Sequence, residues 1–355
     1  MKKHRIGLIG TGAVAGYKHL PEIMSCPDLE LVALCDINQD ALLKTSEKYG
    51  INKEFCFNDY RDLLACPQVD AVDITTPNDV HFEIAMASVA AGKPFSLEKP
   101  VTVDAIQSAK LKDATNKAKL PNMVCFSYRY KTAARYARDI LARELLGDIY
   151  HVNMQYFQSW GNPDLNVPLA WRFQKKRTGS GTMGDLGTHA LDLVRFVTSK
   201  DYTAVCGHTG TIVKSRRLPD GEGCGPVDVD DFSNYMADME DGISASFQIT
   251  RFAFGRGNYQ RLEIYGRKGA LIYKLGEDRG NDSIEVCIGE PQRETNIFSV
   301  LPVPDRFKVD QLQSFADILN KCGDGLSATI DDGHRVQQVT DAILDSAEQR
   351  KWISV

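Results

Sequence analysis

The residue types best suited to proton transfer lie in one glycine-rich segment, residues 179–192. If this segment is helical from Gly184 onward, Asp185 and His189 are four residues apart and share one face, and Asp192 follows on the same stripe. A carboxylate beside an imidazole sets the tautomer of the ring and raises its basicity near neutral pH, as a general base requires. Two structural roles are alternatives: Asp185 as an acid at a helix start, and His189 as a hydrogen-bonded interfacial histidine.

The glycines that precede Asp185 indicate that the backbone there comes close to something bulky. A metal site formed by Asp185, His189 and Asp192 is less favoured, because neither a cysteine nor a second histidine flanks these residues. We therefore expect an acid–base site that uses no metal.

A third candidate for the chemistry, Lys99, lies much earlier in the chain, in Glu98-Lys99-Pro100 after a predicted strand at 94–97. Pro100 restricts the residue before it to an extended backbone. An ammonium group at that position can hold a substrate hydroxyl or a developing alkoxide. The alternative is a surface lysine whose aliphatic stem covers a helix end.

Residues 5–15 predict the element that would bring a cofactor to these groups. An apolar strand runs into a turn with the pattern G-x-G-x-x-A at Gly10, Gly12 and Ala15, and a helix follows. Gly10 permits the sharp turn, Gly12 lets the backbone approach a pyrophosphate, and Ala15 lets the helix pack near the strand. The helix N-terminus offers unpaired N–H groups to the phosphates.

The acid that follows the second predicted strand, Asp36, suits the 2′-hydroxyl of a ribose. Its charge would repel the extra phosphate of NADP, and residues 37–41 contain no lysine or arginine that would compensate. The sequence therefore favours NAD over NADP. A glycine turn without a ligand is the alternative, and the surrounding βαβ pattern argues against it.

Strands and helices alternate through the first third of the chain, which predicts an α/β domain with a doubly wound parallel sheet of the Rossmann type over residues 1–126. Ligands bind such sheets at the carboxyl ends of the strands, where Gly10, Thr76 and Lys99 fall. Short strands separated by glycine-rich turns then predict an α+β domain over residues 127–355, with an open-faced, largely antiparallel sheet.

The composition of the second predicted domain predicts a surface loop at 216–231, which is rich in Gly, Pro and Asp. Two late helices, at 307–320 and 332–349, are predicted to end the chain, and their packing against the first domain is left open.

The chain has 355 residues, a net charge of −5 and no long basic run, so nucleic acid is not an expected partner. No apolar stretch approaches the ~20 residues of a membrane span, and the basic N-terminus leads into the first strand without a signal-peptide core. Nine cysteines without a C-x-x-C pair predict buried thiols in a reducing compartment. We therefore expect a cytoplasmic protein without membrane or nucleic-acid partners.

Taken together, four motifs resemble the Gfo/Idh/MocA oxidoreductase family. They are Gly10-Thr11-Gly12-Ala13-Val14-Ala15, Thr76-Pro77-Asn78 with His81, Glu98-Lys99-Pro100, and Gly184-Asp185-Leu186-Gly187-Thr188-His189 with Asp192. The last two motifs in combination are specific, whereas the glycine turn alone is not. The resemblance implies a Rossmann domain that binds NAD, a sheet domain that binds the substrate, and a homodimer or homotetramer formed through that sheet.

The resemblance also implies a role for each site residue. His189 would take the proton of a sugar or cyclitol hydroxyl, Asp185 would orient His189, and Lys99 would bind the same hydroxyl and the nicotinamide ribose. The cofactor-binding residues would be Gly10, Thr11, Gly12, Ala13, Val14, Ala15, Asp36, Thr76, Pro77, Asn78, His81, Glu98, Lys99 and Arg172. The substrate-binding residues would be Lys99, Tyr128, Arg129, Trp171, Asp185 and His189.

Residues 169–173 resemble a segment that lies near nicotinamide and substrate in some members of the family. Ordinary core packing is an equal alternative for Trp171. Trp160 could stack on a sugar face or serve as a strand aromatic.

The expected function is oxidation of a secondary hydroxyl of a sugar or cyclitol (an inositol-like compound, an aldose or an anhydrosugar) by hydride transfer to NAD. One alternative is a redox-neutral sugar enzyme that keeps its NAD, either a glycosidase or a sugar–sugar oxidoreductase. Another is a non-catalytic NAD-sensing regulator. The intact Lys99, Asp185 and His189 argue against the regulator, because a protein that only binds NAD needs no base paired with an acid.

Overall fold

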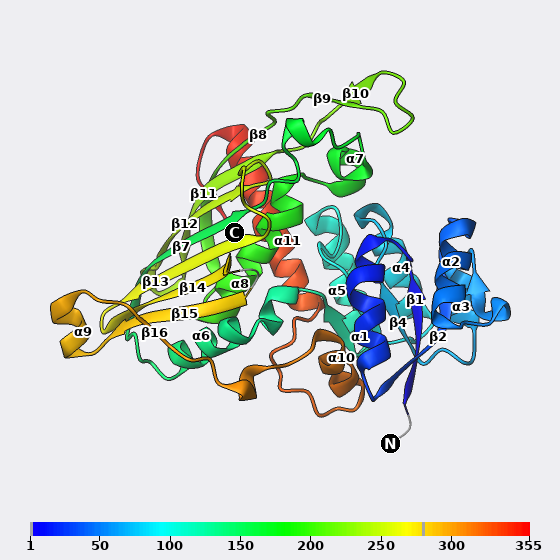
Figure 1. Cartoon of the computed structure of the whole chain (residues 1–355), viewed down its shortest axis with the longest axis horizontal. Coiled ribbons are helices and arrows are strands. Elements are labelled where there is room, and N and C mark those ends of the chain that lie inside the picture. The colour runs from blue at the N-terminus through cyan, green and yellow to red at the C-terminus, as the bar shows by residue number, and fades with distance from the viewer. Residues whose placement is uncertain (1–2, 279–280) are drawn as a thin grey trace. The chain divides into compact units, whose positions relative to one another are not determined.

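The computed structural model describes residues 3–278 and 281–355, which form two compact units (Figure 1). Unit 1 consists of Met1–Phe126 and Val309–Arg335, and unit 2 consists of Ser127–Lys308 and Val336–Val355. Within the described ranges, we find no helix whose length and apolar character would suit a membrane crossing.

Unit 1 is built on a six-stranded parallel sheet with the order β3-β2-β1-β4-β5-β6. Its strands are β1 (His4–Ile9), β2 (Leu29–Cys35), β3 (Cys56–Phe57), β4 (Ala71–Ile74), β5 (Phe95–Leu97) and β6 (Asn122–Val124). Its α-helices are α1 (Leu20–Ser25), α2 (Gln39–Tyr49), α3 (Tyr60–Ala65), α4 (Asn78–Ala90), α5 (Ala105–Ala118) and α10 (Gln311–Leu319), and its short helical turns are η1 (Ala15–His19) and η2 (Lys53–Phe55). This strand order is that of a dinucleotide-binding sheet, so the predicted Rossmann fold is confirmed.

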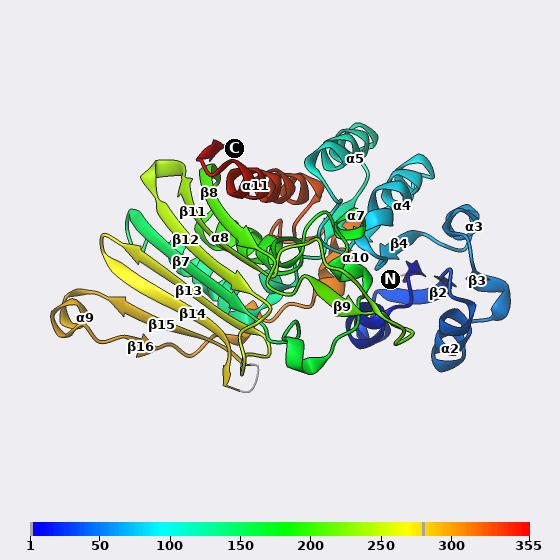
Figure 2. The ribbon, with the colours of Figure 1, turned by 90° about the horizontal axis from the view of Figure 1, so that it is seen from above.

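Helices cover both faces of this sheet, which explains why its strands are apolar on both sides. Helix α4 packs between α3 and α5 on one face, and α2 lies on the other (Figure 2). Helix α1 packs against β2 and α10. All four residues of β4 are buried, and one of them is the acid Asp73. A carboxylate in the middle of a parallel sheet requires a partner, which the site described below supplies.

Unit 2 is built on a nine-stranded sheet with the order β16-β15-β14-β13-β7-β12-β11-β8-β17. Among the described strands, β7 and β12 pair in parallel and the other neighbours pair antiparallel. The strands are β7 (Ile149–Phe157), β8 (Tyr202–Gly210), β11 (Phe232–Met239), β12 (Ser244–Thr250), β13 (Tyr259–Gly266), β14 (Gly269–Asp278), β15 (Asn281–Ile288), β16 (Ser299–Val300) and β17 (Ile353–Ser354). The mixed, largely antiparallel sheet predicted for this part of the chain is thereby confirmed.

The helices of unit 2 include two that pack against each other and against this sheet, α6 (Thr132–Ala142) and α8 (Thr188–Thr198). Helix α11 (Ile330–Gln349) begins in unit 1, and its second half packs against β8. The shorter helices are η3 (Ser127–Tyr130), η4 (Pro163–Leu165), η5 (Trp171–Phe173), α7 (Lys175–Thr178), η6 (Met183–Gly187), η7 (Glu240–Gly242), α9 (Glu290–Thr295) and η8 (Asp305–Phe307).

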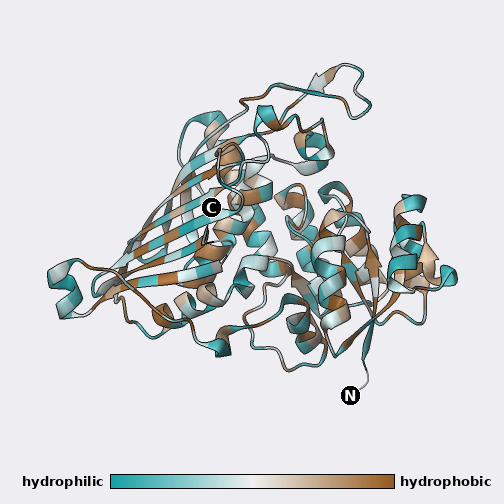
Figure 3. Cartoon of the chain, in the orientation of Figure 1, coloured by the Kyte–Doolittle hydropathy of each residue, from teal (hydrophilic) through white to brown (hydrophobic). Residues whose placement is uncertain are grey.

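The large sheet has one buried and one exposed face. Buried and exposed residues alternate along β11 and β12, and Figure 3 shows the matching alternation of hydropathy along the long strands. Successive side chains of a strand point to opposite faces of the sheet. The alternation therefore shows that one face is covered and the other is open.

Two local predictions were wrong. Residues 216–231 are not a surface loop throughout: they include part of a hairpin of β9 (Ser215–Arg217) and β10 (Cys224–Pro226), and Arg216 and Asp231 are buried. Asp231 forms an ion pair at 2.7 Å with the fully buried Arg251, which lies 20 residues further along the chain. Composition alone could not reveal this contact. The helix predicted at 307–320 begins only at Gln311.

Candidate active site

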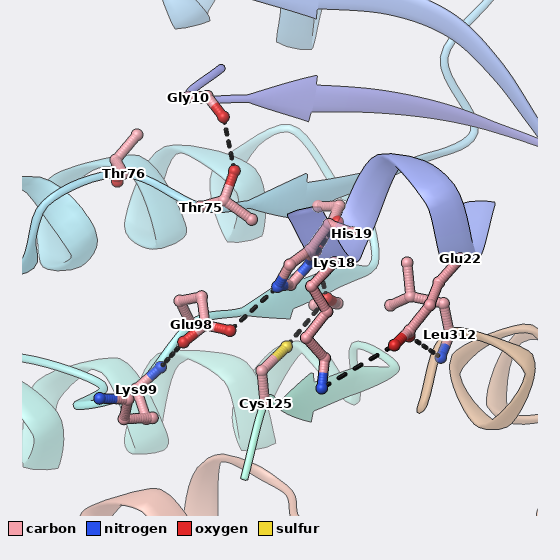
Figure 4. Close-up of polar contacts among 12 residues, drawn as sticks. Gly10, Lys18, His19, Glu22, Thr75, Thr76, Glu98, Lys99, Cys125 and Leu312 are labelled. Atoms are coloured by element: carbon pink, nitrogen blue, oxygen red, sulfur yellow. Dashed lines mark hydrogen bonds and ion pairs between the residues drawn. The ribbon is translucent and has the colours of Figure 1, made fainter. Parts of the chain in front are cut away.

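The turn after β1 contains glycines with two different environments. Gly10 has a φ of +97°, and a Cβ there would lie 2.9 Å from the Thr75 carbonyl carbon. The Thr75 hydroxyl donates a hydrogen bond to the Gly10 carbonyl at 2.6 Å (Figure 4). At Gly12 and Gly16, by contrast, a Cβ would meet open space. The packing of β1 against β4 therefore requires Gly10, whereas Gly12 leaves room for a phosphate group to approach the backbone.

Asp36 closes this turn from the end of β2. Its Oδ2 accepts hydrogen bonds from the Thr11 N–H at 2.7 Å and from the Thr11 hydroxyl at 2.8 Å, and its Oδ1 accepts one from the Asn38 N–H at 2.8 Å. These bonds orient the half-buried carboxylate at the edge of the glycine turn. This position fits the predicted contact with a ribose hydroxyl and the predicted repulsion of a 2′-phosphate.

The turn after β4 leads into α4, which begins at Asn78 after Pro77. The Thr76 hydroxyl is buried and has no hydrogen-bond partner within the described residues, as expected of a group that awaits a ligand. His81 lies between two carbonyl oxygens, with Nε2 2.8 Å from that of Thr76 and Nδ1 2.8 Å from that of Pro100. His81 thus ties this turn to the turn that carries Lys99, and its own contact with the cofactor stays a prediction.

Glu98 and Lys99 follow β5. Glu98 is buried, and its Oε2 accepts the Lys99 N–H at 3.1 Å. Its Oε1 lies 2.9 Å from Nε2 of His19, whose Nδ1 lies 2.8 Å from Oδ2 of Asp73. Figure 4 shows the His19 ring and the Glu98 carboxylate pointing toward each other. Glu98, which precedes the catalytic candidate Lys99, is therefore connected through His19 to Asp73 in the interior of the sheet.

The sequence analysis missed His19 and Asp73, although each carries a signal. His19 comes four residues after the last position of the G-x-G-x-x-A pattern, and Asp73 interrupts an otherwise apolar strand. Burial alone would lower the pKa of His19, but the carboxylates of Asp73 and Glu98 outweigh it and raise that pKa to about 10. For the carboxyl group of Glu98, burial alone would raise the pKa, but the charges of His19 and Lys99 hold that pKa below its ordinary value.

Within the described residues, His19, Asp73 and Cys125 place possible metal-ligand atoms within 4.8 Å of one another. Both ring nitrogens of His19 face carboxylate oxygens, however, and a doubly protonated imidazole has no lone pair to give to a metal. We therefore interpret this cluster as an ion-pair network.

Asp185 and His189 lie on adjoining helical elements of unit 2. Asp185 belongs to the π-helical turn η6, and His189 is in the first turn of α8. Buried Asp230 holds the start of η6: its carboxylate accepts the N–H groups of Gly181 at 2.6 Å and Met183 at 2.7 Å. A Cβ at Gly181 would lie 2.0 Å from the Asp230 carbonyl oxygen. The bulky neighbour that Gly181 accommodates is thus the backbone of Asp230.

His189 is 7% exposed and lies against aromatic rings. The Tyr128 ring centroid is 4.8 Å from that of His189, edge to face, and the Tyr156 centroid is 6.4 Å away. The two tyrosine hydroxyl oxygens are 2.5 Å apart, and Tyr128 also donates to Asn258 Oδ1 at 3.0 Å. Burial, the neighbouring Tyr128 and the charge of Asp185 raise the pKa of Tyr156 well above its ordinary value, so the Tyr156 hydroxyl is neutral. Tyr156 and Asn258 were not predicted.

Arg129 and Asp192 form a buried two-point ion pair. The Arg129 Nε donates to Asp192 Oδ2 at 2.8 Å, and Nη2 donates to Oδ1 at 2.6 Å. Both Asp192 oxygens are therefore engaged in holding η3 to α8. The predicted substrate contact of Arg129 stays a prediction.

The aromatic residues in and around the segment of Trp171 differ in burial and in contacts. Phe173 is fully buried and has the guanidinium groups of Arg216 and Arg251 at 4.1 and 4.6 Å from its ring centroid, and Trp160 packs on it at 5.6 Å. Trp171 is half-buried, with the exposed Arg172 stacked 4.4 Å over its ring. Phe173 and Trp160 thus supply the core packing of this segment.

Two family models match the chain. The oxidoreductase family with an NAD-binding Rossmann fold matches residues 4–126, and the GFO/IDH/MocA C-terminal domain matches residues 134–272. The chain belongs to the Gfo/Idh/MocA family. It is an oxidoreductase of that family, and its first unit is an NAD-binding Rossmann domain.

The similarity to known members extends over the whole chain. Levoglucosan dehydrogenase of Pseudarthrobacter phenanthrenivorans is 29% identical over an alignment of 393 positions, which covers 100% of this chain and 99% of that protein. A structure of levoglucosan dehydrogenase in complex with NADH is 30% identical, with a TM-score of 0.90 over 100% of this chain and 99% of the other. Inositol 2-dehydrogenase of Rhizobium meliloti is 24% identical, with 99% of each chain covered.

Replacement of Asp36 tests the cofactor preference. In Asp36→Ala, we expect NADH binding to weaken roughly 10- to 100-fold, because a hydrogen bond to a charged group contributes about 1.5–3 kcal/mol. NADPH binding should strengthen relative to NADH, since the repelling carboxylate is gone. Fluorescence titration with both nucleotides measures this, and Asp40→Ala, which removes an exposed acid of α2, is the control. Unchanged NADH affinity in Asp36→Ala would contradict the assignment.

Replacement of Gly181 tests the packing that positions Asp185. Gly181→Ala should lower the free energy of unfolding by ~3 kcal/mol, because the new Cβ would overlap the Asp230 backbone. Urea unfolding measures the change. Gly257→Ala is the matched control, since a Cβ at Gly257 meets open space. Equal stability of the two variants would show that this approach of the two backbones is not required.

Proposed function

We propose that this protein is an NAD-dependent dehydrogenase that oxidises a secondary hydroxyl of a sugar or cyclitol. The observation that carries the proposal is the presence of Lys99, Asp185 and His189 in their motifs, in a chain similar over its full length to a sugar dehydrogenase. An anhydrosugar, an aldose and an inositol-like ring are the substrate classes to be tried first.

In the proposed mechanism, His189 takes the proton of the reacting hydroxyl as general base, and Asp185 orients the imidazole. Lys99 holds the same oxygen and stabilises the negative charge that develops on it. When bound, NAD would supply the acceptor for the hydride of the carbinol carbon. The substrate thereby loses one proton and one hydride, and the alcohol becomes a carbonyl.

The residues proposed to hold the cofactor follow the carboxyl edge of the unit 1 sheet. The glycine turn would hold the pyrophosphate, and Asp36 the adenosine ribose. The remaining proposed contacts in unit 1 are Thr76, Pro77, Asn78, His81, Glu98 and Lys99, and Arg172 is a proposed contact from unit 2. The buried Thr76 hydroxyl and the open space beside Gly12 support this placement.

The surroundings of His189 suit a polyhydroxylated ring. Tyr128 and Tyr156 present two hydrogen-bonded hydroxyls beside the proposed base, and such groups can exchange hydrogen bonds with sugar hydroxyls. An aromatic ring such as that of Trp171 can cover the apolar C–H face of a sugar.

The catalytic assignment is tested with Lys99→Ala and His189→Ala. Each should lower kcat/KM about 10²- to 10⁴-fold, because each removes a group that assists proton transfer. Formation of reduced nicotinamide, followed by absorbance with a panel of anhydrosugars, aldoses and cyclitols, measures the activity. Lys117→Ala, which removes an exposed lysine of α5, is the control.

Two outcomes would contradict this proposal. A fully active Lys99→Ala variant would refute the mechanism. NAD that co-purifies with the protein and releases no net NADH on any substrate would favour the redox-neutral alternative.

We also propose that the protein forms a homodimer or homotetramer through the open face of the nine-stranded sheet. Several side chains on that face are small or polar and pair across strands, as Ser246 with Asn153 at 2.6 Å and Gln248 with Gln155 at 2.9 Å. The apolar Met236, opposite Ser246 on the neighbouring strand, is 52% exposed. An open face of this kind suits self-association about a two-fold axis.

Size-exclusion chromatography with light scattering tests this interface. The wild type should have a mass of two or four chains, and Ser246→Arg should shift it toward the monomer, because a long cation would meet its own copy across the axis. Ser25→Arg, at an exposed position of unit 1, is the control. A monomeric wild type would rule the proposed assembly out.

A further inference from the structure

Two buried histidines from different helical elements hold the turn that carries Lys99. His81 of α4 lies 2.8 Å from the carbonyl oxygen of Pro100, the residue after Lys99. His19, the last residue of η1, lies 2.9 Å from the carboxylate of Glu98, the residue before Lys99. The residues on either side of Lys99, Glu98 through its carboxylate and Pro100 through its carbonyl oxygen, are therefore tied to side chains that do not reach solvent.

The link through His19 is continuous from the interior of the sheet to the Lys99 backbone. The Ser96 hydroxyl donates to Asp73 Oδ1 at 2.5 Å, and Asp73 Oδ2 lies 2.8 Å from His19 Nδ1. His19 Nε2 contacts one Glu98 oxygen, and the other oxygen accepts the Lys99 N–H (Figure 4). His19 is fully buried, so water cannot substitute for either carboxylate.

This geometry requires a charged ring. A neutral imidazole has one N–H, whereas both nitrogens of His19 face carboxylate oxygens, so two protons are needed to satisfy both contacts. The charged or titratable groups around it are Asp73 from β4, Glu98 and Lys99 after β5, Cys125 after β6, and Lys18 on its own turn.

Two of these neighbours add little to the charge balance at His19. Burial raises the pKa of the Cys125 thiol well above its ordinary value, so that group is neutral. The Lys18 ammonium lies 3.8 Å from Glu22. The imidazolium is therefore the cation in contact with both buried carboxylates.

We propose that His19 is a positioning residue for Lys99: as an imidazolium shared by Asp73 and Glu98, it keeps Glu98 ionised and in place, and Glu98 holds the backbone of Lys99. This inference rests on the proposed function, in which Lys99 holds the reacting oxygen. Loss of the cation would leave two uncompensated carboxylates in the interior, so Glu98 would bind a proton and release the Lys99 turn.

The test compares His19→Gln with the wild type. We expect kcat to fall about 10- to 100-fold, because a small displacement of a catalytic group has effects of that size. The acidic limb of the kcat/KM profile should also move to higher pH, which a role in packing alone would not cause. Adding Asp73→Asn should recover part of the loss, since it removes one of the two uncompensated charges. His334→Gln, which replaces another buried histidine of unit 1, is the matched control.

The outcomes separate this inference from the proposed function. If His19→Gln keeps the wild-type acidic limb while Lys99→Ala is inactive, the inference is overturned and the proposed function stands. If Lys99→Ala is fully active, the proposed role of Lys99 has failed, and the inference fails with it. If the wild type forms no reduced nicotinamide with any substrate of the panel, the proposed function itself has failed.

Nitrogen-15 NMR of the wild type provides a readout that does not depend on activity. Two protonated ring nitrogens on His19 at pH 8 are expected, and a single protonated nitrogen would overturn the inference. If His19→Gln does not fold, Glu98→Gln tests the same link, because His19 should then lose its second proton at a lower pH than in the wild type. An unchanged titration would contradict the link.

Discussion

A charged imidazole between two buried carboxylates is the contact on which the cofactor half of this protein depends. Removing such charges from water is costly, and the cost is offset only if every partner is well placed, as His19, Asp73 and Glu98 are. Because the folded pKa of His19, about 10, lies above its value of about 6.5 in an unfolded chain, this stabilisation is complete below about pH 6.5 and is lost as the pH rises through about 10. The same contact joins the first helical turn after the glycine loop to the turn with Lys99.

Unit 2 uses buried carboxylates in a similar way. Asp230 satisfies the N–H groups at the start of η6, and Asp192 engages Arg129 in a two-point ion pair. Each interaction fixes one end of the short stretch that contains Asp185 and His189. Both His19 and Asp185 lie on π-helical turns, which are rare in proteins and concentrate at functional sites.

Each unit contributes its own part of the proposed site. A parallel sheet gathers its carboxyl-terminal turns at one edge, which suits the binding of an extended dinucleotide. In unit 2, aromatic side chains pack around the proposed base His189 and keep it largely out of water. Supporting residues inside each unit hold the segments that carry the proposed catalytic side chains, as precise proton transfer requires.

The sequence alone determined the Rossmann domain, the sheet domain, the preference for NAD, and Lys99, Asp185 and His189 as candidates. Those conclusions depend on local patterns: the period of apolar residues, the spacing of glycines, and an acid at the end of a strand. Only the tertiary structure decided that His19 pairs with residues 54 and 79 positions away, that Arg129 pairs with Asp192, and that part of 216–231 is buried. The physical reason is that periodicity and backbone propensity act between near neighbours in the chain. The partner of a buried charge, by contrast, is chosen by how distant segments pack.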